Sequence, residues 1–155
     1  MRVGSLRDQL LLQMKTARSR VLDAVAGLSE EQMSGPAVDG WSVKDHLNHL
    51  TACDEFRFYE IGRVSRGGQA AFRDMDNEQT DALNGLIVTL RRGLPASQVI
   101  ADLEFARALV LDAIAGAPEH ALSGEAYGDF PVDGSIAHDI EHAAAIAAWR
   151  EREGI

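Results

Sequence analysis

The chain has 155 residues, of which 46% are hydrophobic and only 6% aromatic, and its formal net charge is −9. This composition excludes a disordered chain and fits one globular domain over residues 1–155, with an aliphatic core. An acidic surface repels phosphate backbones, and no cluster of Lys and Arg offsets it. We therefore expect no nucleic acid partner.

The cysteine count and the hydropathy of the N-terminal residues indicate the cellular compartment of the protein. Cys53 is the only cysteine, so the chain forms no intrachain disulfide, which fits a reducing cytoplasm. The apolar run at residues 10–12 is bracketed by polar residues and is too short for a signal peptide or a membrane span. The sequence therefore predicts a cytoplasmic protein with no membrane partner.

Apolar residues recur at helical spacing from the start of the chain. They predict a first helix over residues 5–26, ended by Gly27, and then a short helical turn at residues 29–32. Residues 34–40 are rich in Ser, Gly, Pro and Asp, so we expect a loop there.

The second long helix is predicted to open at Ser42, because the spacing from Ser42 to Asp45 is that of a capping box. Gly62 weakens this helix, and residues 63–75 are polar and contain glycine, which indicates a loop.

The second half of the chain predicts three further helices. They cover residues 76–92, residues 97–115 with Ser97 as the cap, and residues 135–152. Residues 116–134 hold several Gly and Pro and form one long connection. The inward face of the last helix is expected to comprise Ile136, Ile140, Ala143, Ile146 and Ala147.

No strand-like alternation extends beyond a few residues, and no repeat or linker divides the chain. Long amphipathic helices without a sheet predict an all-α fold, a four-helix bundle. Residues 76–92 would form an additional, shorter helix.

Three histidines from two predicted helices carry the main functional prediction. His138 and His142 are four residues apart and share one helix face, and His49 on the second helix supplies a third imidazole. At about 100° per residue, these histidines lie roughly 120–150° from the aliphatic stripes of their helices, at the mouth of a groove. Three protein ligands leave one coordination position of a divalent metal open, which is typical of reactive sites.

Other interpretations of these residues stay open. The three histidines could be ordinary surface residues, and His46 could compete as a ligand or lie behind one. Cys53 could approach the metal, although a small buried residue is the interpretation we favour. Asp139 could accept the free N–H of a ligand, and His120 is expected on the surface.

Four aromatic residues are candidates to wall an apolar pocket: Trp41, Tyr127, Phe130 and Trp149. Packing is the alternative for each of them. It is favoured for Trp41, which precedes a helix cap where a hydrophobic staple belongs.

Two segments carry a family resemblance. Residues 40–45 read Gly-Trp-Ser-Val-Lys-Asp and lead to His49, and residues 138–142 read His-Asp-Ile-Glu-His and are followed by Trp149 and Arg150. In this order they resemble the DinB-like family of metal-binding four-helix bundles. That family includes the bacillithiol transferase-type proteins and the metal-binding domain of mycothiol-dependent maleylpyruvate isomerase, and the resemblance covers essentially the whole chain.

The resemblance implies a homodimeric bundle and a divalent ion, zinc or nickel, held by His49, His138 and His142. It also implies chemistry on a low-molecular-weight thiol. We therefore predict a metal-dependent enzyme that acts on a small-molecule substrate by thiol S-transfer or hydrolysis, a transferase or a hydrolase. The alternatives are a non-catalytic, metal-containing bundle that binds or sequesters a ligand, and a metal-free interaction bundle.

Overall fold

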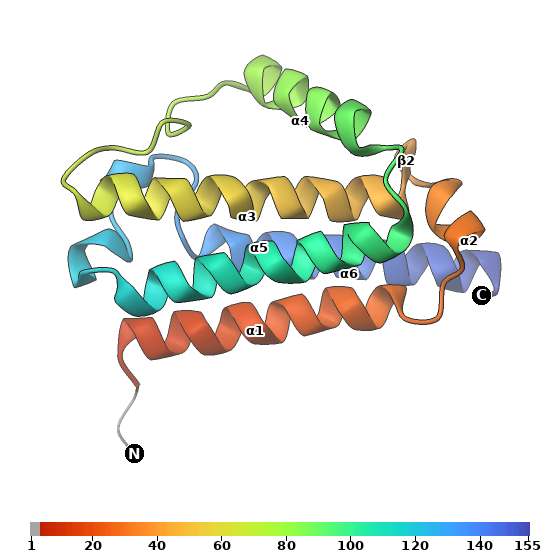
Figure 1. The fold of residues 1–155 in the computed structure, drawn as a ribbon, viewed down its shortest axis with the longest axis horizontal. Coiled ribbons are helices and arrows are strands. Elements are labelled where there is room, and N and C mark those ends of the chain that lie inside the picture. Colours follow the sequence, from red (N-terminus) through yellow and green to blue (C-terminus); the bar gives the residue numbers. More distant parts are fainter. Residues whose placement is uncertain (1–3) are drawn as a thin grey trace.

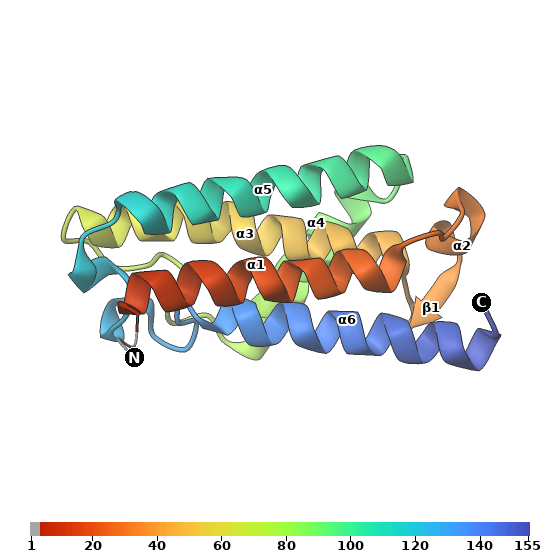
Figure 2. The same cartoon turned by 90° about the horizontal axis from the view of Figure 1, so that it is seen from below.

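Four long helices form the body of the molecule. The structure is a computed structural model and describes residues 4–155. The long helices are α1 (Leu6–Val25), α3 (Val43–Ser65), α5 (Ala96–Gly116) and α6 (Gly134–Glu153). α1 packs against α6, and α3 packs against α5 (Figures 1 and 2). The predicted all-α four-helix bundle is confirmed.

The additional shorter helix, α4 (Asn77–Arg91), lies along the outer side of α3 (Figure 1). It carries the chain back to the end of the bundle where α3 begins, so α5 starts at the same end as α3 and runs parallel to it. This crossover covers one side of α3. It therefore supplies an outer wall for a cavity between α3 and α6.

The capping box predicted for the second long helix is present. The Asp45 N–H donates to Ser42 Oγ and the Ser42 N–H donates to Asp45 Oδ2, both at 3.0 Å. The cap predicted at Ser97 is wrong, because α5 begins one residue earlier. The exposed carboxylate of Glu30 takes its place, since the Ala96 N–H donates to Glu30 Oε2 at 2.7 Å.

The segment expected as a loop before α3 contains two short strands. After α2 (Glu30–Ser34), β1 (Pro36–Val38) pairs antiparallel with β2 (Trp41–Ser42). Asp39 and Gly40 connect them with φ angles of 53° and 82°. This left-handed backbone is what a two-residue hairpin turn requires, and Asp-Gly is a typical sequence for it. The strands are too short for alternating hydropathy to reveal them.

The long connection from α5 to α6 contains two 3-10 turns, η1 (Glu119–Ala121) and η2 (Glu125–Tyr127). Gly128 follows η2 with a φ of 57°, and a Cβ there would overlap the backbone of Arg73. Only glycine allows so close an approach. The contact joins this connection to the segment that precedes α4.

The bundle core is interrupted by a polar layer, which we define as Arg18, Asp54, Arg107 and Asp139. Each of the four long helices contributes one of these residues, and each residue is at most 4% exposed. One apolar cluster, which includes Met14, Ile61 and Val110, lies on one side of the layer along the helices. A second cluster lies on the other side and includes Val21, Leu47, Leu103 and Ile146.

The polar layer is closely hydrogen-bonded. Arg18 donates to Asp139 and Asp54 at 3.0 Å, and Arg107 donates to Asp54 at 2.8 Å and pairs with Asp139 at 3.0 Å. Two arginines and two aspartates make the layer neutral. No buried side-chain nitrogen or oxygen among the described residues lacks a partner.

The inward face predicted for α6 is partly wrong. Ile140 is 38% exposed and Ala147 is exposed, whereas Asp139, Ala143 and Ile146 are buried. The reason is the polar layer: α6 turns Asp139 toward the arginines of α1 and α5, which rotates Ile140 outward.

Candidate metal centre

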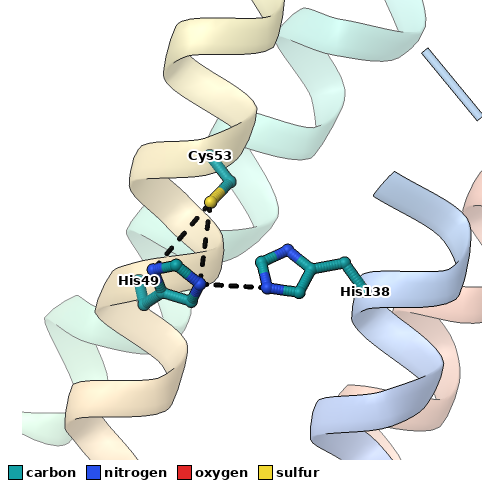
Figure 3. A group of neighbouring side chains, drawn as sticks. All are labelled: His49, Cys53 and His138. Atoms are coloured by element: carbon teal, nitrogen blue, oxygen red, sulfur yellow. Dashed lines mark hydrogen bonds between the residues drawn. The ribbon is translucent and has the colours of Figure 1, made fainter. Parts of the chain in front are cut away.

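α3 and α6 bring four imidazoles together. His46 and His49 come from α3, and His138 and His142 come from α6. His138 Nε2 lies 3.0 Å from His49 Nε2 and 3.0 Å from His142 Nε2. The three histidines predicted to share a metal are therefore neighbours, and Figure 3 shows His49 and His138 pointing toward each other from the two helices.

The spacing of these nitrogens fits a metal ion. Imidazole nitrogens bound to one zinc ion at about 2.0–2.1 Å lie roughly 3.4 Å apart in tetrahedral geometry. A neutral imidazole nitrogen offers either one hydrogen or one lone pair, so His138 Nε2 cannot make a full hydrogen bond to both of its neighbours. A shared cation would satisfy His138 Nε2 together with a neighbouring nitrogen, and imidazole suits both zinc and nickel.

Cys53 also reaches this cluster. Its Sγ lies 3.8 Å from His49 Nε2, and His49, Cys53 and His138 each offer a ligand atom within 4.8 Å of the others (Figure 3). These three residues could hold a metal ion. The sequence had left this approach open as the less favoured interpretation of Cys53, because its spacing of four from His49 indicated a shared helix face.

Burial sets the protonation of these groups. Burial, together with the neighbouring imidazoles, lowers the pKa of His49 to about 4 and that of His142 to about 3. Burial also lowers the pKa of His46 and of His138, and it raises the pKa of the Cys53 thiol to about 12. The imidazoles are therefore neutral near pH 7 and have lone pairs available for a metal.

His46 lies behind His142 and determines its tautomer. His46 Nε2 lies 3.3 Å from the Val38 carbonyl oxygen, which only accepts, so this nitrogen carries the hydrogen. His46 Nδ1 then accepts from His142 Nδ1 at 2.9 Å. The lone pair of neutral His142 is consequently on Nε2, the atom that faces His138. The β-hairpin anchors this chain of hydrogen bonds, and the Trp41 ring packs against His46 and His49.

The contacts of Asp139 differ from the sequence prediction, in which its carboxylate accepts a hydrogen bond from a metal-binding histidine. Its carboxylate oxygens accept hydrogen bonds from Arg18 at 3.0 Å and pair with Arg107. Within residues 4–155, none of its hydrogen bonds comes from an imidazole. Asp139 therefore fixes α6 within the polar layer, next in sequence to His138.

A cavity of about 390 Å³ adjoins the cluster. Its lining includes His49, Cys53 and His138 at the cluster. Apolar residues of α3, α4 and the connections form much of the remainder: Phe56, Phe72, Met75, Leu83, Tyr127, Phe130 and Pro131. Charged side chains also line it: Arg57, Glu60, Arg73, Asp129 and Glu141. The predicted wall residues Tyr127 and Phe130 are among them, whereas Trp149 packs in the core. His120 is exposed, as expected.

Two solved structures share this fold. An uncharacterised protein from Escherichia coli UTI89 has a TM-score of 0.77 at 16% identity, covering 99% of this chain and 97% of its own. The colibactin self-resistance protein ClbS, in complex with double-stranded DNA, has a TM-score of 0.79 at 10% identity, covering 97% of this chain and 98% of its own. No curated protein matches the sequence significantly.

The expectation that nucleic acid is excluded as a partner is wrong, because ClbS has the same fold and is bound to DNA. Net charge sums over the whole surface, whereas contact with DNA depends on the charge of one face. The value of −9 therefore does not exclude DNA. Separately, none of the helices in residues 4–155 combines the length and the apolar character that a membrane span requires.

The match of the sequence to a family model identifies the family. The family model of the DinB superfamily matches residues 13–153, nearly the whole chain. The match includes α3, α5, α6, residues 13–25 of α1 and every residue of the histidine cluster. The chain belongs to the DinB superfamily.

Proposed function

We propose that this protein is a divalent-metal-dependent enzyme that acts on a small organic molecule by thiol S-transfer or hydrolysis. The observation that carries the proposal is the approach of His49 Nε2 and His142 Nε2 to within 3.0 Å of His138 Nε2, with His49 and His138 lining one end of a cavity. Zinc or nickel bound there would lower the pKa of a coordinated thiol or water and so supply a nucleophile. A single free cysteine fits the cytoplasm as its compartment.

The protein's own residues would position and shield the reaction. The aromatic and aliphatic walls of the cavity exclude water from the reacting groups, which strengthens electrostatic interactions there. His46 keeps His142 in the tautomer that directs a lone pair toward His138. The polar layer holds α3 and α6 in register, because Cys53 is followed by Asp54 and His138 by Asp139.

Substitutions of His46 test whether this residue orients His142 for metal binding. In His46→Asn the amide oxygen can take the place of Nδ1 and accept from His142, so we expect metal affinity within a few-fold of wild type. In His46→Leu no acceptor remains, and we expect affinity to fall about 10- to 100-fold, as for other residues that orient a metal ligand. Competition titration with a chromophoric chelator measures both; equal loss in the two variants would contradict this role.

Changes at Cys53 and His142 distinguish two possible ligand sets. We expect Cys53→Ser to bind metal as wild type does, and His142→Ala to bind much more weakly, because the third ligand is proposed to be an imidazole. Cobalt-substituted protein gives an independent readout, since a cysteine ligand adds a thiolate-to-cobalt charge-transfer band. The opposite pattern, with the band present and lost in Cys53→Ser, would replace His142 by Cys53 in the site.

Turnover decides between an enzyme and a sequestering protein. Metal-loaded wild-type protein is incubated with a panel of low-molecular-weight thiols and alkylating electrophiles, and separately with activated esters and amides. Catalytic product formation that is lost on chelation and in His49→Ala supports the proposal. Binding at one equivalent without turnover of any substrate class would favour the non-catalytic alternative.

A further inference from the structure

Arg57 is a charged residue of the cavity wall that the proposed metal chemistry does not use. It lies on α3 one turn beyond Cys53 and lines the same cavity. Arg57 is half-buried, whereas the buried arginines Arg18 and Arg107 both pair with aspartates of the polar layer. Within residues 4–155, no carboxylate oxygen lies within 4.0 Å of the Arg57 guanidinium.

Neutral groups hold Arg57 in place. Its Nη1 donates to the Phe130 carbonyl at 2.8 Å, its Nη2 donates to the Pro131 carbonyl at 2.9 Å, and its Nε faces Ser135 Oγ at 3.4 Å. These bonds occupy three of its five N–H groups. The guanidinium is thus fixed before any ligand arrives, which reduces the entropy cost of binding one.

The charge of Arg57 is not balanced by these contacts. Burial lowers its pKa, and the Tyr127 ring, 5.5 Å from the guanidinium carbon, offers only a weak cation–π contact. Arg57 is half-buried, and a charge partly removed from water is stabilised when an opposite charge pairs with it. A ligand in the cavity is placed to supply that charge.

We propose that the cavity binds a small organic carboxylate, with its anionic group at Arg57 and its apolar body along Phe72, Met75 and Leu83. Arg57 follows His49 by eight residues, about 12 Å along the helix axis, so such a molecule extends toward the histidine cluster. A monoanion fits better than a phosphate dianion, because the lining holds three carboxylates, Glu60, Asp129 and Glu141, against two guanidinium groups, Arg57 and Arg73, and so repels additional negative charge. The inference rests on the proposed function in one respect only: the expectation that the reacting group of the ligand lies at the histidine cluster.

Isothermal titration calorimetry with 4-phenylbutyrate and its neutral isostere 4-phenylbutyramide tests the carboxylate site. Both are titrated into full-length protein, metal-loaded and metal-free. Hydrogen bonds to charged groups are among the stronger ones, so we expect the carboxylate to bind about 10- to 100-fold more tightly than the amide in both forms. Equal binding of the two probes, or no binding of either, would overturn the inference without touching the metal proposal.

Two substitutions assign the selectivity to Arg57. Arg57→Gln should remove the preference for the carboxylate, and Arg57→Lys should retain part of it. Arg152→Gln, which removes the same charge at an exposed position of α6, should bind as wild type does. Carboxylate selectivity that appears only with metal, or that persists in Arg57→Gln, would place the anion elsewhere and overturn the assignment. The wild-type comparison of the two probes stands even if an Arg57 variant folds poorly.

Discussion

Replacing Asp54 by alanine is expected to lower the free energy of unfolding by about 3–5 kcal/mol, the range for removing one partner of a buried ion pair. Asp54 is 1% exposed and accepts hydrogen bonds from both Arg18 and Arg107. Its removal leaves two buried guanidinium groups with Asp139 as their only carboxylate partner in the described part of the chain. Urea denaturation followed by far-UV circular dichroism measures the loss. A loss of this size is a large part of the roughly 5–15 kcal/mol by which a typical domain is stable.

A surface ion pair provides the control for this experiment. Asp74 pairs with Arg73 at 3.2 Å, but its side chain is 81% exposed. Asp74→Ala should therefore cost no more than about 1 kcal/mol, since solvent screens exposed pairs. If Asp54→Ala proved as mild as Asp74→Ala, the polar layer would not be a main determinant of stability.

The polar layer also shows where prediction from the sequence failed. Apolar periodicity located the four long helices and α4 to within a few residues, because their core positions are aliphatic and regularly spaced. The same method assigns every charged residue to the surface. Arg18, Asp54 and Arg107 therefore could not be recognised as core residues, since their burial depends on partners that are distant in the sequence.

The sequence also predicted part of the candidate site. Helical spacing alone put His138 and His142 on one face, and the capping box at Ser42 fixed the start of the helix that carries His49. What remained hidden depends on tertiary contacts. The hydrogen bond from His46 to Val38 requires the β-hairpin, and the approach of Cys53 to His138 requires the packing of α3 beside α6.

Replacing His49 by alanine is expected to abolish stoichiometric metal binding. His49 and His138 belong to both possible ligand sets, so the prediction holds whether His142 or Cys53 completes the site. Loss of a direct ligand should weaken binding by more than about 100-fold, the upper end of the effect for residues that only orient a ligand. Elemental analysis of protein purified without a histidine tag checks this, with about one ion per chain expected in wild type.

Thermal stability gives a second measure of the same site. An ion that binds only the native state stabilises it by about 2.7 kcal/mol at a free concentration of 100 times its Kd. Added zinc or nickel should therefore raise the Tm of wild type and of His120→Ala but not that of His49→Ala. His120 is exposed on η1 and contacts the Val64 carbonyl, at the opposite end of α3 from His46 and His49. A metal-dependent rise in Tm that survives in His49→Ala would mean that the ion binds elsewhere, and the meeting of imidazoles between α3 and α6 would then be a packing feature of the bundle.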